Sequence, residues 1–302
     1  MEKIRLNPEC INCLLKKHLE SYPENADTET RIEYMQSILK IIGNAPKYYS
    51  SPKLLNSINE VKSRMFGFKE DFTEIKKHFN ALMLEAEPQL TEKLNEAGDS
   101  LRRALCYSMM GNYIDFGTRK SVDEAELKNL LWNTSDEMID DKAYRELRGD
   151  LAKAKRLAYL TDNCGEIVMD KMFIRVIQER YPDISVTAIV RGGNILNDAT
   201  IEDAKQVGLT DIVTVIDNGN HIAGTWLEEI SGQAMSKIDN ADVIISKGQA
   251  NFESLYQCGK NIYYAFMCKC KLFSDRFKVP MFHGIFVNDK DVCRLMEGKE
   301  DA

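Results

Sequence analysis

The chain has 302 residues, 44% hydrophobic and 29% charged, a composition typical of an ordinary globular protein with one large domain or two. Its formal net charge of −7 argues against a nucleic-acid-binding surface, because phosphate-binding surfaces need an excess of basic residues. No apolar run approaches the roughly 20 residues that span a bilayer, and the stretch MEKIRLNPEC lacks the apolar core of a signal peptide. We therefore expect a cytoplasmic protein that binds neither nucleic acid nor a membrane.

Residues 1–150 show helical periodicity almost throughout. The segments NPECINCLLKKHLESYP and TETRIEYMQSILKIIGNAP both repeat apolar residues on one helical face, and a Gly-Asn-Ala-Pro stop ends the second. Gly, Pro and Asp-Ser signals separate four further predicted helices, at 52–66, 70–97, 99–116 and 122–132. Because period-2 alternation is almost absent, we predict an all-α N-terminal domain over residues 1–150.

Residues 151–302 alternate short apolar, β-branched runs with helical patterns. Strands are predicted at 157–160, 184–190, 211–217, 242–246, 261–266 and 284–288, with helices at 165–180, 198–207, 225–239 and 250–257. This alternation is typical of βαβ units around a parallel sheet covered on both faces. We predict an α/β fold: a three-layer sandwich with a mostly parallel, Rossmann-like sheet.

Polar loops follow four of the predicted strands. Their sequences are DNCGE from Asp162, RGGNILNDAT from Arg191, DNGNH from Asp217 and SKGQANFE from Ser246. Because the carboxyl ends of parallel strands meet at one edge of a sheet, where α/β proteins bind ligands, these loops should lie together. Each loop alone is weak evidence, since such residues are common in turns and helix caps; Asn197 or Asp198 would equally cap a helix starting at 199.

The residue types in these loops favour phosphate chemistry with a divalent cation. Aspartate and asparagine oxygens without a histidine cluster suit Mg²⁺ or Mn²⁺ rather than Zn²⁺. Arg191 and Lys247 would neutralise an anion beside that cation, as phosphoryl transfer requires. His221, in the Gly/Asn loop of the same edge, is a candidate substrate contact. Glu166 is either catalytic or a carboxylate that complements the dipole of its helix.

The motifs DNCGEIVMD, RGGNILNDAT and SKGQANFESL resemble those of the metal-dependent damage-control phosphatases, a former domain of unknown function. The N-terminal Cys10-Ile11-Asn12-Cys13 is similar to that of the shorter prokaryotic subgroup. The resemblance implies a metal held by Asp162, Asn163 and Asp198, and a phosphate near Lys247. It also matches Asn251 to a family asparagine, and Arg191 and Asn197 to polar positions of the second motif.

The resemblance further implies a phosphoric monoester hydrolase that acts on small metabolites, such as sugar phosphates or damaged and surplus compounds. Its cofactor would be Mn²⁺, Mg²⁺, Co²⁺ or Ni²⁺. Asp162 is then either an aspartyl nucleophile or a metal ligand that helps position an attacking water. The adjacent Asn163 and the distant Asp198 favour the ligand role, and Asp198 is an alternative general base. Asp162, Asp198 and Lys247 are the predicted catalytic residues.

The cysteines allow a separate, structural metal site. Cys10 and Cys13 start a predicted helix, while Cys268 and Cys270 follow a predicted strand. Four thiolates would suit Zn²⁺, but the second pair has only one intervening residue, so a redox pair or buried free thiols are favoured.

Two functions from other classes stay open. One is a carboxyl methyltransferase that uses S-adenosylmethionine, although the single glycine of DNCGE lacks a Gly-x-Gly nucleotide-binding pattern. The other is a non-catalytic metal-binding module. The sequence names neither the substrate nor the oligomeric state.

Overall fold

The computed structural model describes residues 4–67, 71–114, 123–134 and 138–297. Helices precede the first strand, as predicted, and the predicted helix ends at 70, 115–116 and 122 lie outside the described residues. These helices are α1 (Pro8–Leu19), α2 (Thr28–Gly43), α3 (Ser51–Phe66), α4 (Thr73–Asn95), α5 (Ser100–Gly111), α6 (Glu124–Trp132) and α7 (Asp141–Leu151). Local chemistry fixes their starts: Asn7 caps α1 by accepting a hydrogen bond from the Cys10 amide at 2.9 Å.

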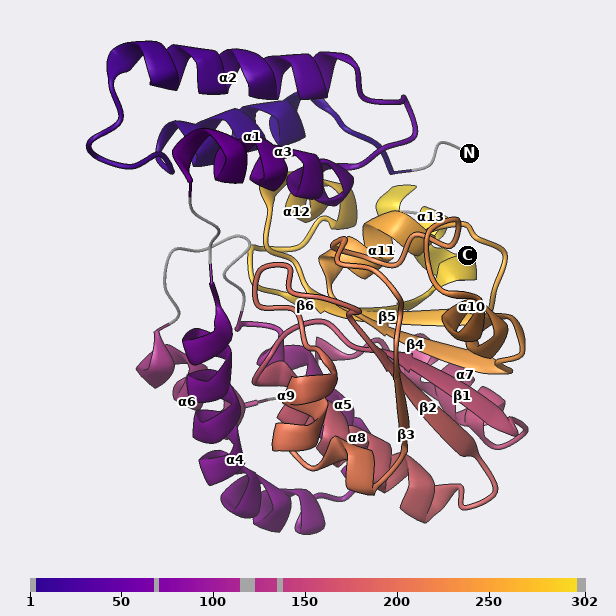
Figure 1. The fold of residues 1–302 in the computed structure, drawn as a ribbon. Helices are drawn as coiled ribbons and strands as arrows, with labels where there is room; N and C mark the ends of the chain where they lie inside the picture. The colour runs from indigo at the N-terminus through magenta and orange to yellow at the C-terminus, as the bar shows by residue number, and fades with distance from the viewer. Residues whose placement is uncertain (1–3, 68–70, 115–122, 135–137, 298–302) are drawn as a thin grey trace.

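The second half forms one six-stranded sheet with the order β3-β2-β1-β4-β5-β6 (Figure 1). Its strands are β1 (Arg156–Leu160), β2 (Ser185–Val190), β3 (Thr214–Asp217), β4 (Val243–Lys247), β5 (Ile262–Met267) and β6 (Gly284–Asn288). Neighbouring strands pair in parallel except β5 and β6, which are antiparallel. The intervening and C-terminal helices are α8 (Glu166–Arg180), α9 (Ile201–Gln206), α10 (Gly232–Asp239), α11 (Gln249–Leu255), α12 (Lys271–Phe277) and α13 (Val292–Glu297). The predicted mostly parallel sheet is confirmed.

Side chains of the strands alternate between two cores on opposite faces of the sheet. Leu157 and Tyr159 of β1 pack with α4, α5, α7 and α8, whereas Ala158 and Leu160 pack with α10, α11 and α12. Nearly every strand residue is buried, because helices cover both faces. The result is the predicted three-layer sandwich, with α8 fully buried over most of its length against α5.

The N-terminal helices divide between two cores. Helices α1–α3 form a small core of their own around Tyr34, Ile38 and Ile58, and Figure 1 shows them as a layer above α11 and α12. Helices α4–α7 instead contribute to the larger core on one face of the sheet. The sequence change near residue 150 therefore marks a change of secondary structure, while the sheet core continues across it.

One predicted helix is shorter in the structure, and three helices of the structure were not predicted. The predicted helix over 225–239 begins only at Gly232, because residues 225–231 form a loop that packs against α3. There the Lys53 ammonium lies 4.9 Å from the centroid of the Trp226 ring and pairs with Glu229. Helices α7, α12 and α13 were not predicted. Within the described residues, no helix is both long and apolar enough to cross a bilayer.

Candidate metal and phosphate site

The loops after β1 and β4 meet where the strand order reverses. Asp162 lies two residues beyond β1, and Gly248 directly follows β4. Gly248 has φ +82° and ψ 155°, a conformation essentially restricted to glycine. A Cβ at this position would come within 3.0 Å of all three atoms of the Asp162 carboxyl group. The backbone of one loop therefore packs directly on the carboxylate of the other, at the usual ligand-binding point of an open α/β sheet.

Two carboxamides hold the Asp162 carboxylate. Asn112 Nδ2 donates to Asp162 Oδ2 at 3.0 Å, and Asn163 Nδ2 donates to the same oxygen at 2.7 Å. Both amides also donate to Glu166 Oε2, at 2.8 and 2.9 Å. All four residues are buried, with at most 7% exposure. The shared donors lock the orientation of both amide groups.

This locking decides which oxygen Asn163 presents. Because its amide nitrogen faces Asp162 and Glu166, its Oδ1 must point the other way, and no described residue donates a hydrogen bond to it. An amide oxygen fixed beside a carboxylate is a good ligand for a hard cation. Glu166 therefore orients Asn163, in addition to standing in the first turn of α8.

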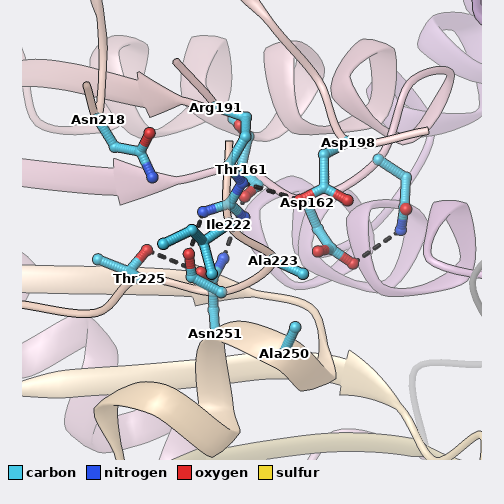
Figure 2. A network of polar contacts seen from close by, with 12 residues as sticks. Thr161, Asp162, Arg191, Asp198, Asn218, Ile222, Ala223, Thr225, Ala250 and Asn251 are labelled. Atoms are coloured by element: carbon cyan, nitrogen blue, oxygen red, sulfur yellow. Dashed lines mark hydrogen bonds and ion pairs between the residues drawn. The ribbon is translucent and has the colours of Figure 1, made fainter. Parts of the chain in front are cut away.

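The loop after β2 brings Asp198 to the same place (Figure 2). Asn163 and Asp198 form an isolated antiparallel bridge, and the Ala199 amide donates to the Asp162 carbonyl at 2.7 Å. Arg191 Nε donates to Asp198 Oδ2 at 2.8 Å, and Arg191 Nη1 donates to the Gly224 carbonyl. Thr200 caps α9 with Asp203, so neither Asn197 nor Asp198 serves as that helix cap. The predicted metal residues Asp162, Asn163 and Asp198 thus lie together.

Lys247 lies behind this group and faces away from the open edge. Its ammonium donates to the Ser108 carbonyl at 2.9 Å, Glu166 Oε1 at 2.6 Å and Asp170 Oδ1 at 2.9 Å. The side chain is fully buried, and these contacts use all three of its donors. In this arrangement no donor is left for the predicted phosphate contact. Lys247 is connected to Asp162 through Glu166, which shares the amide donors of Asn112 and Asn163 with Asp162.

Burial and charge shift the pKa values in this network. Burial raises the pKa of Asp170 to about 6, against the opposing effects of Lys247 and of the hydrogen bond from Tyr159. Burial alone would lower the pKa of Lys247, but the charges of Asp170 and Glu166 outweigh it and raise that pKa. The lysine therefore stays protonated, and its charge compensates part of the buried negative charge.

Two predicted substrate contacts are occupied by the protein itself. Asn251 Nδ2 donates to the carbonyls of Thr161 and Lys247 at 3.1 and 2.8 Å, and its Oδ1 accepts from the Thr225 hydroxyl at 2.8 Å. Asn197 Nδ2 donates to the Ile114 carbonyl at 3.1 Å. As placed, both asparagines stabilise the loops of the site instead of presenting an amide to a ligand.

His221 is exposed and lies beside the loop that follows β2. A Cβ on Gly193 would lie 3.0 Å from His221 Cβ, so the imidazole flanks the loop after β2. It lines a cleft shared with α3. The aromatic side chains of Trp226 and Phe252 are both buried, and Phe252 packs among Tyr264, Phe266 and Phe273. They belong to the core.

The four cysteines suggested for zinc are all free thiols. Burial raises the pKa values of Cys10, Cys268 and Cys270 to about 11, which makes thiolates unfavourable at neutral pH. Within the described part of the chain, no three His, Cys, Asp or Glu side chains are grouped so that they could hold a metal ion. The ligand set at the sheet edge has two carboxylates and a carboxamide. The zinc site stays a prediction.

Sequence reasoning did not find Asn112. It follows the C-terminal Gly111 of α5, where it resembles an ordinary helix stop, yet it is fully buried and its Oδ1 accepts from the Met267 amide at 3.0 Å. No local pattern marks it. A buried asparagine just after a helix that packs on α8 becomes informative only once the fold is known.

Comparison with known proteins identifies the family. The model of the damage-control phosphatase ARMT1-like domain matches residues 6–283. The chain belongs to this family. A damage-control phosphatase of Archaeoglobus fulgidus is 28% identical over 97% of this chain and 100% of its own length. A damage-control phosphatase of Pyrococcus horikoshii is also 28% identical, over 92% of this chain and 96% of its own length.

The crystal structure of a DUF89 family protein from Pyrococcus horikoshii agrees with this fold. It superposes with a TM-score of 0.77 at 27% identity and covers 94% of this chain and 99% of that chain. An uncharacterized protein of Methanocaldococcus jannaschii is 28% identical over 93% of this chain and 94% of its own length. The predicted resemblance is confirmed along nearly the whole chain, including the N-terminal helices.

Proposed function

We propose that this chain is a metal-dependent phosphatase that hydrolyses small phosphate monoesters. Its divalent cation would be held by Asp162, Asn163 and Asp198. The observation that carries the proposal is the fixed orientation of the Asn163 amide, which presents an oxygen beside two carboxylates at the ligand-binding edge. The names of the relatives as damage-control phosphatases support the reaction class.

The charges of the site support a cation. Asp162, Asp198, Glu166 and Asp170 are four buried carboxyl groups. Arg191 pairs with Asp198, and Lys247 pairs with Glu166 and Asp170. Buried charges are costly unless they are paired or coordinate a metal. Mg²⁺, Mn²⁺, Co²⁺ and Ni²⁺ accept oxygen ligands of this kind, and a bound cation would act as a Lewis acid on phosphoryl oxygens and lower the pKa of water.

Arg191 is suited to bind the transferring phosphoryl group. Its Nε and Nη1 are used by Asp198 and by the Gly224 carbonyl, but Nη2 makes no hydrogen bond with the described residues. The two contacts fix the guanidinium, so Nη2 can donate to a phosphoryl oxygen without first being ordered. The ion pair also fixes the position of the Asp198 carboxylate, which suits a metal ligand.

Asp162 is held in the manner of a ligand. Its carboxylate accepts two amide hydrogen bonds and packs against the Gly248 backbone. These restraints keep the group in place and limit the movement that nucleophilic attack on phosphorus would require. We therefore favour direct attack by water, with Asp162 holding the cation.

The direct test is phosphate release from sugar phosphates, nucleotides and p-nitrophenyl phosphate with each of the four metals and with chelator. We expect metal-dependent release, reduced about a hundredfold or more in Asp162→Ala and Asp198→Ala. Asp183→Asn, an exposed aspartate just before β2 at the opposite edge, should behave as wild type. Release that survives loss of Asp162 would place the chemistry elsewhere. No release from any ester would favour the methyltransferase or binding-module readings.

Replacing Asn112 by leucine should weaken Mn²⁺ binding about 10- to 100-fold, because Asp162 and Glu166 each lose an orienting donor. Titration calorimetry measures this directly. Asn288→Leu is the matched control, since Asn288 is also a buried asparagine but lies at the opposite edge of the sheet, where its amide donates to Asn261. Equal Mn²⁺ affinity in wild type and Asn112→Leu would contradict the positioning role.

A further inference from the structure

A cleft of about 360 Å³ separates α3 from the turn that follows β2. Most of the side chains that line it are polar and come from both halves of the chain. They are Asn56, Asn59, Glu60, Lys62, Ser63 and Arg64 of α3, Phe72 before α4, Asn194, Ile195 and Leu196 after β2, and His221 after β3. Its volume lies within the range of small-molecule sites, about 300–1,000 Å³.

One wall of this cleft is continuous with the candidate metal site. The Asp198 amide donates to the Ile195 carbonyl at 3.1 Å, so the cleft wall and the metal-site carboxylate belong to a single turn. Leu196 holds φ +48° within that turn, an unfavourable conformation for a side chain of its size. The Cys164 amide fixes the next residue by donating to the Asn197 carbonyl at 2.8 Å. A ligand with its phosphoryl group at Asp198 thus has the cleft beside it.

The charges of the cleft favour an anion. Lys62 and Arg64 oppose the single carboxylate of Glu60, in a protein whose net charge is −7. Lys62 is 5% exposed. Arg64 is exposed, and its guanidinium makes no hydrogen bond or ion pair with any described residue. Its donors are therefore available to a bound group, and guanidinium binds carboxylates and phosphates bidentately.

We propose that this cleft binds the organic part of the substrate and that Arg64 recognises a second anionic group on the α3 side of the cleft. The inference rests on the proposed phosphatase function and narrows its substrate class. The preferred substrates are phosphate monoesters that carry another phosphate or a carboxylate, joined by a polyhydroxylated chain. The carboxamides of Asn59 and Asn194 and the imidazole of His221 suit hydroxyl groups between the two anions.

The kinetic test compares three ester types: a hexose monophosphate, a hexose bisphosphate and a phosphorylated hexonic acid. In wild type, KM should be lower for the bisphosphate and the hexonate, which carry a second anionic group. Arg64→Ala should raise KM for those two about tenfold, with little change for the monophosphate and in kcat. An effect on the bisphosphate alone would identify phosphate as the second group, and an effect on the hexonate alone would identify carboxylate.

Lys40→Ala is the matched control, because Lys40 is an exposed cation in the last turn of α2, outside the cleft. If Lys40→Ala raised KM as much as Arg64→Ala, the effect would reflect general charge, and the proposal would be wrong. Equal KM values for the wild type and Arg64→Ala with both the bisphosphate and the hexonate would also overturn it.

Calorimetric binding of the bisphosphate and the hexonate separates this proposal from the phosphatase function. In one outcome, wild type binds either compound without releasing phosphate, while Arg64→Ala binds it about tenfold more weakly. That result would support the cleft proposal and contradict the proposed phosphatase function. If wild type hydrolyses the monophosphate but binds neither the bisphosphate nor the hexonate more tightly than the monophosphate, the phosphatase proposal is supported and the cleft proposal is wrong.

Discussion

Replacing Gly248 by alanine should abolish phosphate release while leaving the chain folded. The new Cβ would overlap the Asp162 carboxyl group, and alanine would have to adopt φ +82° and ψ 155°. Moving either loop by about 1 Å separates Asp162 from Asp198, and displacements of that size cost about a hundredfold in rate. We expect the rate of phosphate release to fall by about a hundredfold or more. Mn²⁺ should stabilise the wild type against heat by binding its folded state, and it should no longer stabilise this variant.

Gly259→Ala provides the comparison. Gly259 also has a positive φ, +79°, but a Cβ there would meet nothing within 4 Å. It should cost about 1 kcal/mol of stability for the left-handed backbone and leave activity intact. If Gly248→Ala were no more damaging to activity than Gly259→Ala, the close packing of the β4 loop on Asp162 would not matter for function.

Replacing Lys247 by methionine should lower the free energy of unfolding by about 3–5 kcal/mol. The substitution leaves Glu166 and Asp170 buried without their counter-charge, and breaking a buried ion pair on one side costs about this much. Activity should fall as well, because Glu166 orients Asn163 and Asn112. Denaturant unfolding and phosphate release at a temperature where the variant is folded measure the two effects separately.

The loss of stability in Lys247→Met should depend on pH. Asp170 has a pKa of about 6 in the folded protein and an ordinary value of 3.8, so the folded state binds its proton more tightly than the unfolded state. Stability that this group contributes at low pH is lost as the pH rises from about 4 towards 6. Without Lys247 the pKa rises further, which extends the loss to higher pH. The deficit should therefore be larger at pH 8 than at pH 5.

Lys171→Met separates stability from function. Lys171 is likewise buried on α8 and pairs with Glu87 at 2.7 Å, but it contacts none of the candidate metal residues. The Lys171→Met variant should have a lower free energy of unfolding than wild type. Its folded molecules should release phosphate at the wild-type rate. A Lys247→Met variant with wild-type activity in its folded state would show that the Glu166 network does not support the site.

The sequence by itself determined the strands, most of the helices and the edge of the sheet that carries the site. These follow from short-range patterns: apolar runs at strand spacing, helical periodicity, and Asp, Asn and Gly where each strand ends. Because the strands are parallel, those loops had to meet, and Asp162, Asn163 and Asp198 do so. The family resemblance rested on the same local motifs and extends over nearly the whole chain.

Only the tertiary structure decided which side chains face the site and which support it. Lys247 is the last residue of β4, next to a loop rich in candidate ligands, yet the packing of α8 turns its ammonium towards Glu166 and Asp170. Asn112 is 50 positions from Asp162, and Arg64 lies on a helix with no site motif. Such contacts depend on how helices pack against the sheet. Residue spacing predicts whether a segment forms a helix or a strand. The topology of the whole chain determines which other elements that segment packs against.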